Sequence, residues 1–136
     1  MVYILIDDYQ QFLVRYRLPR YMKVGDTATI KVYFINKSEY TLGVSLSFPK
    51  VDEALEVGAI TLELPIVEPH DFTTKSFPLT ALKPSRKAKI TVGGNGFNMG
   101  PEDIAFYDEF ERRTYILPCD FKYDAAYAHE WYDMLW

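Results

Sequence analysis

Hydrophobic and polar residues alternate along two neighbouring stretches, 27–34 and 41–48, on either side of the polar segment Asn36–Tyr40. Side chains of a β-strand point to opposite faces in turn, so this period of two predicts strands with one buried face. Two such strands around a polar turn are typical of an antiparallel pair. The side chains expected to face the core are Ala28, Ile30, Val32, Phe34, Leu42, Val44, Leu46 and Phe48.

Shorter β-prone runs continue along the chain. We expect further strands at Val2–Ile6, Gln11–Leu18, Ile60–Ile66, Phe72–Leu79 and Lys87–Val92, the last with Ile90 facing inward. Pro65 favours an edge position for its run, because proline has no N–H to donate to a neighbouring strand. About seven to nine short strands, separated by frequent turn signals, are typical of a β-sandwich.

Two segments depart from this pattern. Gly93–Gly100 contains four glycines, and we expect a mobile loop there, less protected than the strands, because glycine is conformationally permissive. Pro101–Leu117 is compatible with two structures. It forms either a hairpin with its turn at Asp108–Glu111 or a helix that starts at Pro101. The β-prone run Arg113–Leu117 favours the hairpin.

The stretch Leu18–Asp26, followed by an alternating strand and then Asn36, resembles the opening of immunoglobulin-like β-sandwich modules of the cell-adhesion and macroglobulin kind. Ala88–Val92 followed by Phe106–Phe110 resembles their closing hairpin. The resemblance implies an all-β fold, an immunoglobulin-like antiparallel β-sandwich, in a module that binds or builds and has no shared catalytic residues. We place this domain at residues 1–123.

The last residues, 124–136, are expected to form a separate aromatic tail with a short helix. Asp124 is a suitable N-cap for a helix over Ala125–Leu135, with Ala128 and Trp131 on one stripe. Such a helix either packs on its own sandwich or docks on another subunit. Aromatic residues and methionine are enriched at protein interfaces. The predicted interface residues are Tyr127, Trp131, Tyr132, Met134, Leu135 and Trp136.

Charge is unevenly distributed along the chain. Of the total net charge of −4, residues 101–136 carry −6 and the first 100 residues carry +2. An acidic tail would select a basic surface, and the set around Lys83–Lys89 of another copy is one candidate. The sequence has a pI of about 5.1, so the chain lacks the overall positive charge that is typical of nucleic-acid-binding proteins.

Candidate catalytic and ligand-binding groups are sparse. Cys119 is the only cysteine, so no intrachain disulfide forms, and neither it nor His129 lies in a nucleophile signature. His70 belongs to a turn, and the carboxylates around Asp108 lack the spacing of a calcium loop. The glycines from Gly93 lack the Lys-Ser/Thr of a phosphate loop. We expect no catalytic residue, cofactor or metal.

The N-terminus lacks the basic start and long apolar run of a secretion signal, and no stretch approaches the ~20 apolar residues that span a membrane. We therefore expect a non-enzymatic structural or interaction subunit of a larger assembly, such as a virion or tail-like particle. Its partners are other proteins or copies of itself, with no nucleic acid and no membrane. The alternatives are a cell-surface adhesion module, glycosylated at the Asn36-Lys37-Ser38 sequon, and a cytosolic adaptor or inhibitor.

Overall fold

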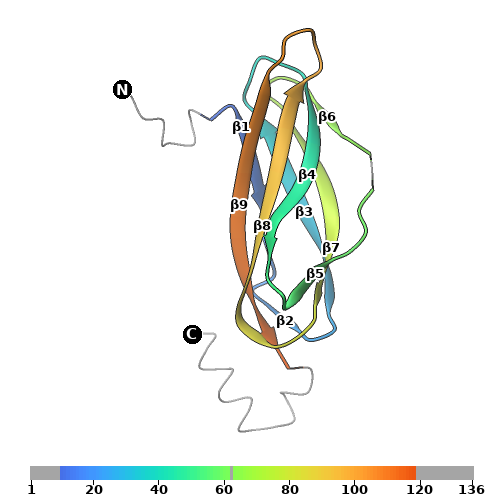
Figure 1. The fold of residues 1–136 in the computed structure, drawn as a ribbon, viewed down its shortest axis with the longest axis vertical. Helices are drawn as coiled ribbons and strands as arrows, with labels where there is room; N and C mark the ends of the chain where they lie inside the picture. The colour runs from blue at the N-terminus through green and yellow to red at the C-terminus, as the bar shows by residue number, and fades with distance from the viewer. Residues whose placement is uncertain (1–9, 62, 119–136) are drawn as a thin grey trace, which may run out of the picture.

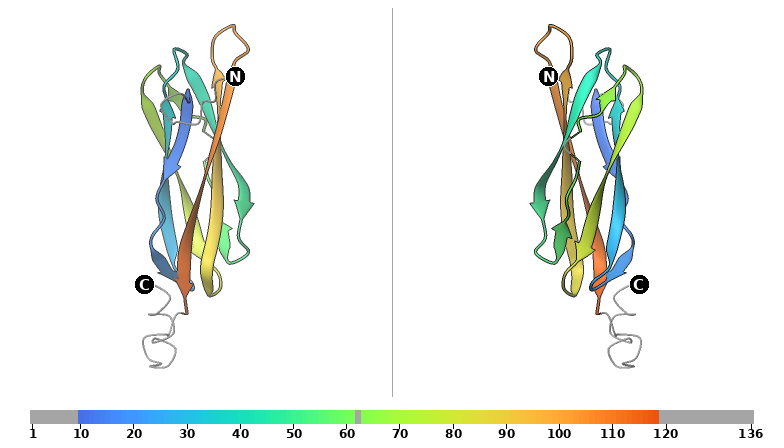
Figure 2. Two further views of the ribbon diagram at one scale, coloured as in Figure 1. Left: turned by 90° about the vertical axis from the view of Figure 1, so that its left-hand side faces the viewer. Right: turned by 90° about the vertical axis from the view of Figure 1, so that its right-hand side faces the viewer.

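The computed structural model of the protein describes residues 10–61 and 63–118, which form two β-sheets packed face to face (Figures 1 and 2). These residues contain no helix. Their strands, in chain order, are β1 (Phe12–Tyr16), β2 (Tyr21–Lys23), β3 (Thr27–Asn36), β4 (Leu42–Val51), β5 (Leu55–Val57), β6 (Ile66–Val67), β7 (Phe72–Ala81), β8 (Ser85–Asn98) and β9 (Ala105–Leu117). The predicted all-β sandwich is confirmed. The strand predicted at Val2–Ile6, the domain boundary at residue 123 and the C-terminal helix lie outside the described residues.

The first sheet has the strand order β1-β3-β7-β5, and all of its pairings are antiparallel. Strand β3 lies inside this sheet, with Phe34 opposite Val14 on one side and opposite Thr73 on the other. Val32 and Phe34 are buried, whereas Lys31 between the inward positions is exposed. The alternation along β3 thus separates a core face from a solvent face, as the sequence pattern predicts.

The second sheet has the strand order β2-β9-β8-β4-β6. Strands β8 and β9 form a long antiparallel hairpin, and β2 adds to the outer edge of β9 in parallel. Because β1 belongs to the first sheet and β2 to the second, the chain changes sheets between Tyr16 and Tyr21. This change brings β1 beside β9 along one side of the sandwich (Figure 1), where the Val14 N–H donates to Asp108 Oδ2 at 2.9 Å.

The core lies between the sheets and takes side chains from both. The rings of Phe12 and Phe34 stack with centroids 6.2 Å apart, and those of Phe48 and Phe77 meet edge to face at 4.9 Å. Leu46 is only partly buried, although it packs against the core. The predicted core residues with exposures of 3% or less are Ile30, Val32, Phe34, Leu42, Val44 and Ile90.

Strands β3 and β4 are not an antiparallel pair, so that prediction is wrong. Strand β3 pairs with β1 and β7, whereas β4 pairs with β8 and β6 in the other sheet. The turn around Asn36–Tyr40 crosses from one sheet to the other. Alternation shows which side chains of a strand face the core. Strands in the two facing sheets show the same alternation, because both sheets pack on one core. Alternation therefore does not identify a strand's hydrogen-bonded neighbour.

The glycine-rich segment is a strand through Asn98 and not a loop. Gly93–Asn98 pair with β4 on one side and β9 on the other. A Cβ placed on Gly94 would lie 2.7 Å from Cε1 of Phe34 and 2.8 Å from Cγ2 of Val14. Glycine is needed there because the side chains of the facing sheet pack against its backbone. The turn that was predicted to begin at Gly93 is confined to residues 99–104.

Pro101–Leu117 is neither a hairpin nor a helix. Ala105–Leu117 form one continuous strand, and the expected turn at Asp108–Glu111 lies in its middle, opposite Thr91–Gly94 of β8. Glu109 and Glu111 are tolerated because they are exposed, and Asp108, on the other side of the strand, is tolerated because it pairs with Arg15 of β1. A hairpin does form, but between β8 and β9. The glycine-rich segment is the part of β8 that pairs with the first half of β9.

The strand expected at Ile60–Ile66 is reduced to Ile66–Val67, with Leu62 outside the described residues. The chain here passes from β5 at the edge of the first sheet to β6 at the edge of the second. Among its described apolar residues, Ile60 packs against the core, whereas Leu64 and Ile66 are exposed. Separately, the described residues contain no helix of the length and apolar character needed to span a membrane.

Candidate protein-binding surface

The six predicted interface residues, 127 and beyond, all lie outside the described residues, as do Cys119 and His129. Their role stays a prediction. The basic set around Lys83–Lys89 is described: Lys83 pairs with Glu53 at 2.8 Å, and Lys87 is exposed on β8. Lys89, at the end of this set, lines a hollow of about 380 Å³ together with Glu111, Arg112 and Arg113 of β9.

The groups considered for metal or proton chemistry have local partners. His70 has a positive φ of 59° in the β6–β7 turn, and its Nε2 lies 2.8 Å from Oε1 of Glu39, with both side chains exposed. Asp108 pairs with Arg15, and Glu109 accepts a hydrogen bond from Tyr107. Within residues 10–61 and 63–118 no three His, Cys, Asp or Glu side chains converge to hold a metal ion.

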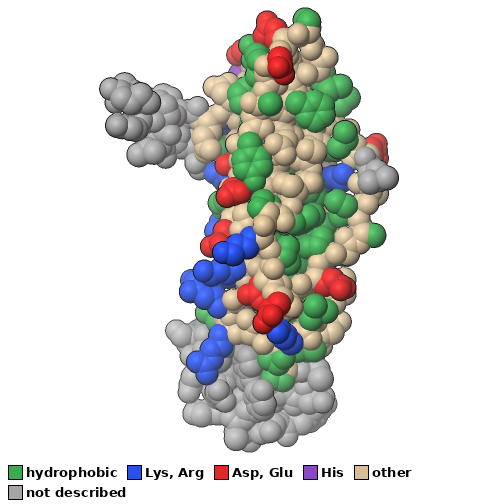
Figure 3. Space-filling view, in the orientation of Figure 1, with side chains coloured by type: hydrophobic (Ala, Val, Ile, Leu, Met, Phe, Trp, Pro, Cys, Tyr) green, Lys and Arg blue, Asp and Glu red, His purple; other side chains and the backbone are tan. Residues whose placement is uncertain are grey.

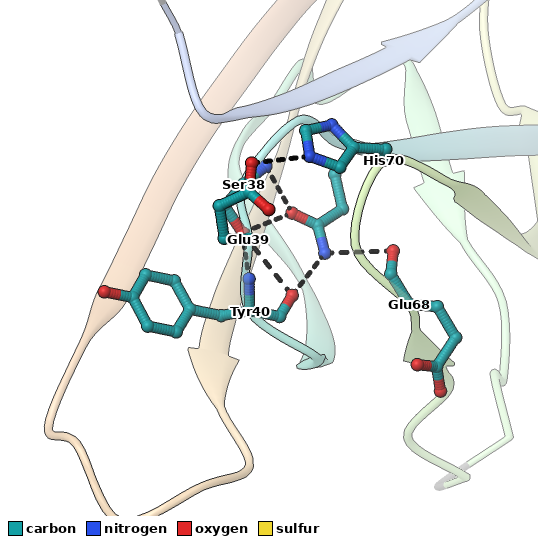
Figure 4. A network of polar contacts seen from close by, with 6 residues as sticks. Ser38, Glu39, Tyr40, Glu68 and His70 are labelled. Carbon is teal, nitrogen blue, oxygen red and sulfur yellow. Dashed lines mark hydrogen bonds and ion pairs between the residues drawn. The ribbon is translucent and has the colours of Figure 1, made fainter.

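A buried amide organises the end of the sandwich where β3 turns into β4 (Figure 4). The Nδ2 group of Asn36 donates to the carbonyls of Tyr40 at 2.7 Å and Glu68 at 3.1 Å. Its Oδ1 accepts from both the N–H and the hydroxyl of Ser38, at 2.9 and 2.6 Å. One side chain thereby ties the β3–β4 turn to the β6–β7 turn. We call Asn36 and Ser38, with these carbonyls, the Asn36 network.

The Asn36 network makes the glycosylation sequon at Asn36 inaccessible in the folded protein. Asn36 is 0% exposed, and its Nδ2, the atom that would carry a glycan, is hydrogen-bonded. A glycan on Nδ2 would displace these bonds and require space inside the fold. Asn36 is therefore a structural residue in the folded protein, and the sequon does not mark a surface module.

The clearest concave feature with concentrated charge is a cleft of about 550 Å³ on the side of the sandwich where β1 meets β9. Four basic and three aromatic side chains line it, which is why we call it the cationic cleft. Figure 3 shows Lys and Arg side chains gathered along the lower half of the β9 edge. The lining residues are Arg15, Tyr16, Arg17, Lys31, Tyr33, Phe110 and Arg112.

Strand geometry places these residues together. Arg15 and Arg17 lie two positions apart, with buried Tyr16 between them, so both project from the outer face of the first sheet. Arg15 stands opposite Tyr33 in the β1–β3 register, and Lys31 follows two positions along β3. From the other sheet, Phe110 and Arg112 share one side of β9. Two sheets therefore contribute to one cleft.

Aromatic contacts hold the guanidinium groups in place. The Arg15 and Arg112 guanidinium carbons lie 4.5 and 4.0 Å from the centroid of the Phe110 ring, within the range of cation–π attraction. Asp108 Oδ2 accepts from Arg15 Nη1 at 3.1 Å and from the Val14 N–H. The cleft is thus anchored to the scaffold at its Asp108 end.

Tyr16 forms the inner wall of the cleft. Its hydroxyl lies 2.9 Å from the carbonyl of Ile90 and 2.6 Å from that of Phe110, each a hydrogen-bond acceptor. Its ring meets the Phe110 ring edge to face at 5.7 Å. Burial raises the pKa of the Tyr16 phenol, so the hydroxyl stays protonated and donates to the backbone. Tyr16 links the two sheets at this point through its hydroxyl. Its phenol is neutral, so the charge of the cleft comes from the basic residues.

Next to the cationic cleft, and sharing Tyr33 with it, lies a second hollow of about 590 Å³. Its lining includes Ile35, Phe72 and His70, and the Tyr33 and Phe72 ring centroids are 5.8 Å apart. The outer face of the first sheet thus changes from basic to aromatic along β3. A ligand with acidic groups next to apolar groups would match the cationic cleft and the adjoining aromatic hollow together.

The outer face of the second sheet differs. Small outward residues such as Gly43 and Gly93 lie beneath aromatic side chains: a Cβ on Gly43 would lie 2.8 Å from the Phe97 ring, and one on Gly93 would lie 2.7 Å from the Tyr107 hydroxyl oxygen. Phe97 and Tyr107 remain partly exposed on this face, which Figure 3 shows from the front. The rings occupy the space that a side chain at either glycine would need.

Alternation along the strand predicted at Gln11–Leu18 is enough to put Arg15 and Arg17 on one face, but nothing in the sequence joins them to Lys31 and Arg112. The missing information was that Pro101–Leu117 is a strand and that it runs beside β1. Without that pairing, Phe110 and Arg112 had no position relative to the other cations.

No known protein family and no curated protein matches this sequence. Solved structures do match its fold. Against Escherichia coli alpha-2-macroglobulin from domain MG7 to the C-terminus, the TM-score is 0.63 at 16% identity, covering 79% of this chain and 16% of that one. Against Salmonella alpha-2-macroglobulin reacted with methylamine, it is 0.62 at 14% identity, covering 79% and 7%.

A third similar structure is a single domain. The match to the ASH/PapD-like domain 7 of human CEP192 has a TM-score of 0.54 at 10% identity and covers 88% of this chain and 95% of that one. The chain thus spans 7–16% of the macroglobulin chains and nearly all of the PapD-like domain. At these identities the likeness is one of fold. The chain therefore has the immunoglobulin-like, macroglobulin-like β-sandwich fold that its sequence resembles.

Proposed function

We propose that this chain is a non-enzymatic structural or interaction subunit of a larger assembly and that it docks through its aromatic C-terminal tail. The contact residues in this proposal are Tyr127, Trp131, Tyr132, Met134, Leu135 and Trp136. The partners are other proteins or further copies of this chain, without a role for nucleic acid or membrane. A virion or tail-like particle is the setting we propose.

The observation that carries this proposal is the character of the described surface. Large apolar side chains stay exposed on both outer faces of the sandwich, with Phe72 at 56%, Ile66 at 55% and Tyr107 at 50%. Exposed aromatic and apolar groups are typical of surfaces that bind other proteins. The fold supports the same interpretation, since similar domains occur as one small part of the long macroglobulin chains.

The test is the native mass of the purified full chain, alone and with its natural partners, before and after Trp131→Ala combined with Trp136→Ala. We expect the unchanged protein to associate and the double variant to lose association with a nearly unchanged melting temperature. Tyr107→Ala is the matched control. It removes an exposed aromatic residue from the outer face of the second sheet and should weaken association less than the tail variant, because the proposed docking contact is the tail.

Two results would contradict the proposal. A double variant that stays associated but melts much earlier would identify the tail as a lid on its own sandwich, with the interface elsewhere. A chain that remains a monomer and recovers one tight partner regardless of the tail would favour the adaptor alternative.

A further inference from the structure

The cationic cleft holds positive charge that the described residues leave largely uncompensated. Arg15 pairs with Asp108, but Arg17, Lys31 and Arg112 form no ion pair with a carboxylate of residues 10–61 or 63–118. Cations held close together repel one another, and a bound anionic group relieves that repulsion. The cleft is therefore suited to a ligand with several negative charges.

The cleft also selects for rings. The Phe110 ring is flanked by two guanidinium groups, and Lys31 Nζ lies 5.8 Å from the centroid of the Tyr33 ring. The adjoining hollow adds Phe72 and Ile35. An aromatic side chain entering here meets both cations and apolar surface. Inorganic anions and simple acidic chains would use only part of this lining.

One segment of this chain has the complementary composition. Residues 119–136 contain four acids against one lysine, and six aromatic residues. Acidic and aromatic residues alternate closely along it, as in Glu130-Trp131-Tyr132-Asp133. With residues 119–124 extended and the expected helix over Ala125–Leu135, the segment spans about 40 Å, which is long enough to leave one copy and reach the cleft of another.

We infer that the cationic cleft is the receptor for residues 119–136 of a second copy of this chain, an inference that rests on the proposed function and names its partner. Each copy supplies one acidic aromatic segment and one cationic cleft. Mutual exchange between two copies closes a dimer, whereas exchange that does not close extends an array. Either arrangement suits a subunit of a repeating assembly.

The experiment measures self-association of the full chain by sedimentation in low and moderate salt. Arg17→Glu with Arg112→Glu reverses two cleft charges that have no carboxylate partner among the described residues. We expect it to weaken self-association about tenfold or more. The neutral pair Arg17→Gln with Arg112→Gln should weaken it less, and added salt should weaken the unchanged protein.

A matched control reverses the same number of charges elsewhere. Lys83→Glu with Lys87→Glu reverses two exposed charges of the other basic set that the sequence suggested, away from the hollow that Lys89 shares with Arg112. This control should leave self-association unchanged. If it abolishes association and the cleft variant does not, the receptor is the Lys83–Lys89 surface and the inference is overturned.

Mixing provides the decisive arm. The cleft variant keeps an intact tail, and the Trp131→Ala, Trp136→Ala variant keeps an intact cleft. Neither should associate alone, but the mixture should form a complex, because one copy's tail enters the other's cleft. A mixture that stays monomeric would show that the tail of one copy does not enter the cleft of another, which overturns the inference.

The outcomes separate this inference from the proposed function. Loss of association in the tail variant alone would leave the proposed function standing and overturn the cleft as receptor. An unchanged protein that never self-associates would overturn the second copy as occupant, while a foreign partner held by the tail would still satisfy the proposed function. Association that neither variant alters would overturn both.

Discussion

The Asn36 network and the cationic cleft are both polar clusters, but they relate to the fold in opposite ways. In the network, one buried amide donates to two turn carbonyls within about 3 Å and accepts from Ser38, so the polar atoms satisfy one another. In the cleft, several cations lie together at the surface, and Asp108 is the described carboxylate that pairs with one of them. The network is internally complete, whereas the cleft lacks counter-charges.

This difference separates residues that hold the fold from residues that are available to a partner. A buried, fully hydrogen-bonded group contributes to stability because its loss leaves other buried groups unsatisfied. Exposed like charges contribute little to folding and can weaken it. Mutations in the Asn36 network should therefore change the free energy of unfolding, whereas mutations of the cleft cations should change binding.

The largest effect should come from the core beneath both clusters. Phe34→Ala removes a fully buried ring that stacks on Phe12 and packs against the backbone of Gly94. We expect a loss of about 3–5 kcal/mol in the free energy of unfolding, because the rigid glycine strand cannot close the cavity. Urea denaturation followed by circular dichroism of the β-sandwich measures it. A loss under about 1 kcal/mol would contradict the assigned core face.

Asn36→Ala should follow, at about 2–4 kcal/mol, because it leaves the turn carbonyls of Tyr40 and Glu68 without their donor. Ser38→Ala is the milder companion, since it removes only the hydroxyl that donates to Asn36 Oδ1. Thermal unfolding of both variants gives the ranking. If Ser38→Ala proves the more damaging of the two, the amide is not the centre of the network.

Asp108→Ala should cost about 1–3 kcal/mol, because Asp108 joins the cleft to the scaffold. The change removes the acceptor for the Val14 N–H at the free edge of β1 and the partner of Arg15. Asp108→Asn keeps an acceptor of the same shape and should recover part of the loss. Equal stability of the two variants in denaturant would mean that the edge contact contributes nothing.

The smallest effect on folding should come from the cleft cations. Arg17→Gln with Lys31→Gln should change the free energy of unfolding by no more than about 0.5 kcal/mol, since both side chains are exposed. Salt should stabilise the unchanged protein more than the variant, because it screens the repulsion that the variant has lost. A clear destabilisation at all salt concentrations would place these residues with the Asn36 network and remove the contrast.

The sequence predicted individual strands well where alternation was strong. Ile30, Val32 and Phe34 are buried as expected, because a period of two depends only on the geometry of one strand. It failed for Gly93–Asn98, where glycines signalled a loop. Glycine is required at Gly94 because Phe34 and Val14 of the facing sheet pack so closely against its backbone that no Cβ fits. No local pattern predicts contacts between residues that lie 60 positions (Phe34 and Gly94) and 80 positions (Val14 and Gly94) apart in the sequence.

The cleft was predictable only in part, for a related reason. Arg15 and Arg17 could be assigned to one face from the sequence, but the position of Arg112 depends on β9 lying beside β1. The acidic residues Asp108–Glu111 resemble a turn by composition. They are nevertheless in the middle of a strand, because β8 supplies a full set of backbone partners.

What the sequence by itself determined was the class of the fold, the inward side chains of the strongly alternating strands and the local chemistry of turns such as Gly25-Asp26, where Gly25 has a φ of 93°. These features depend on neighbours along the chain. The tertiary structure decided which strands pair, that β3 and β4 belong to opposite sheets, that Asn36 is buried, and that cations from β1, β3 and β9 form one cleft. Each of these depends on segments far apart in sequence, and backbone hydrogen bonding accepts almost any residue as a partner, so only packing of the whole core selects among them.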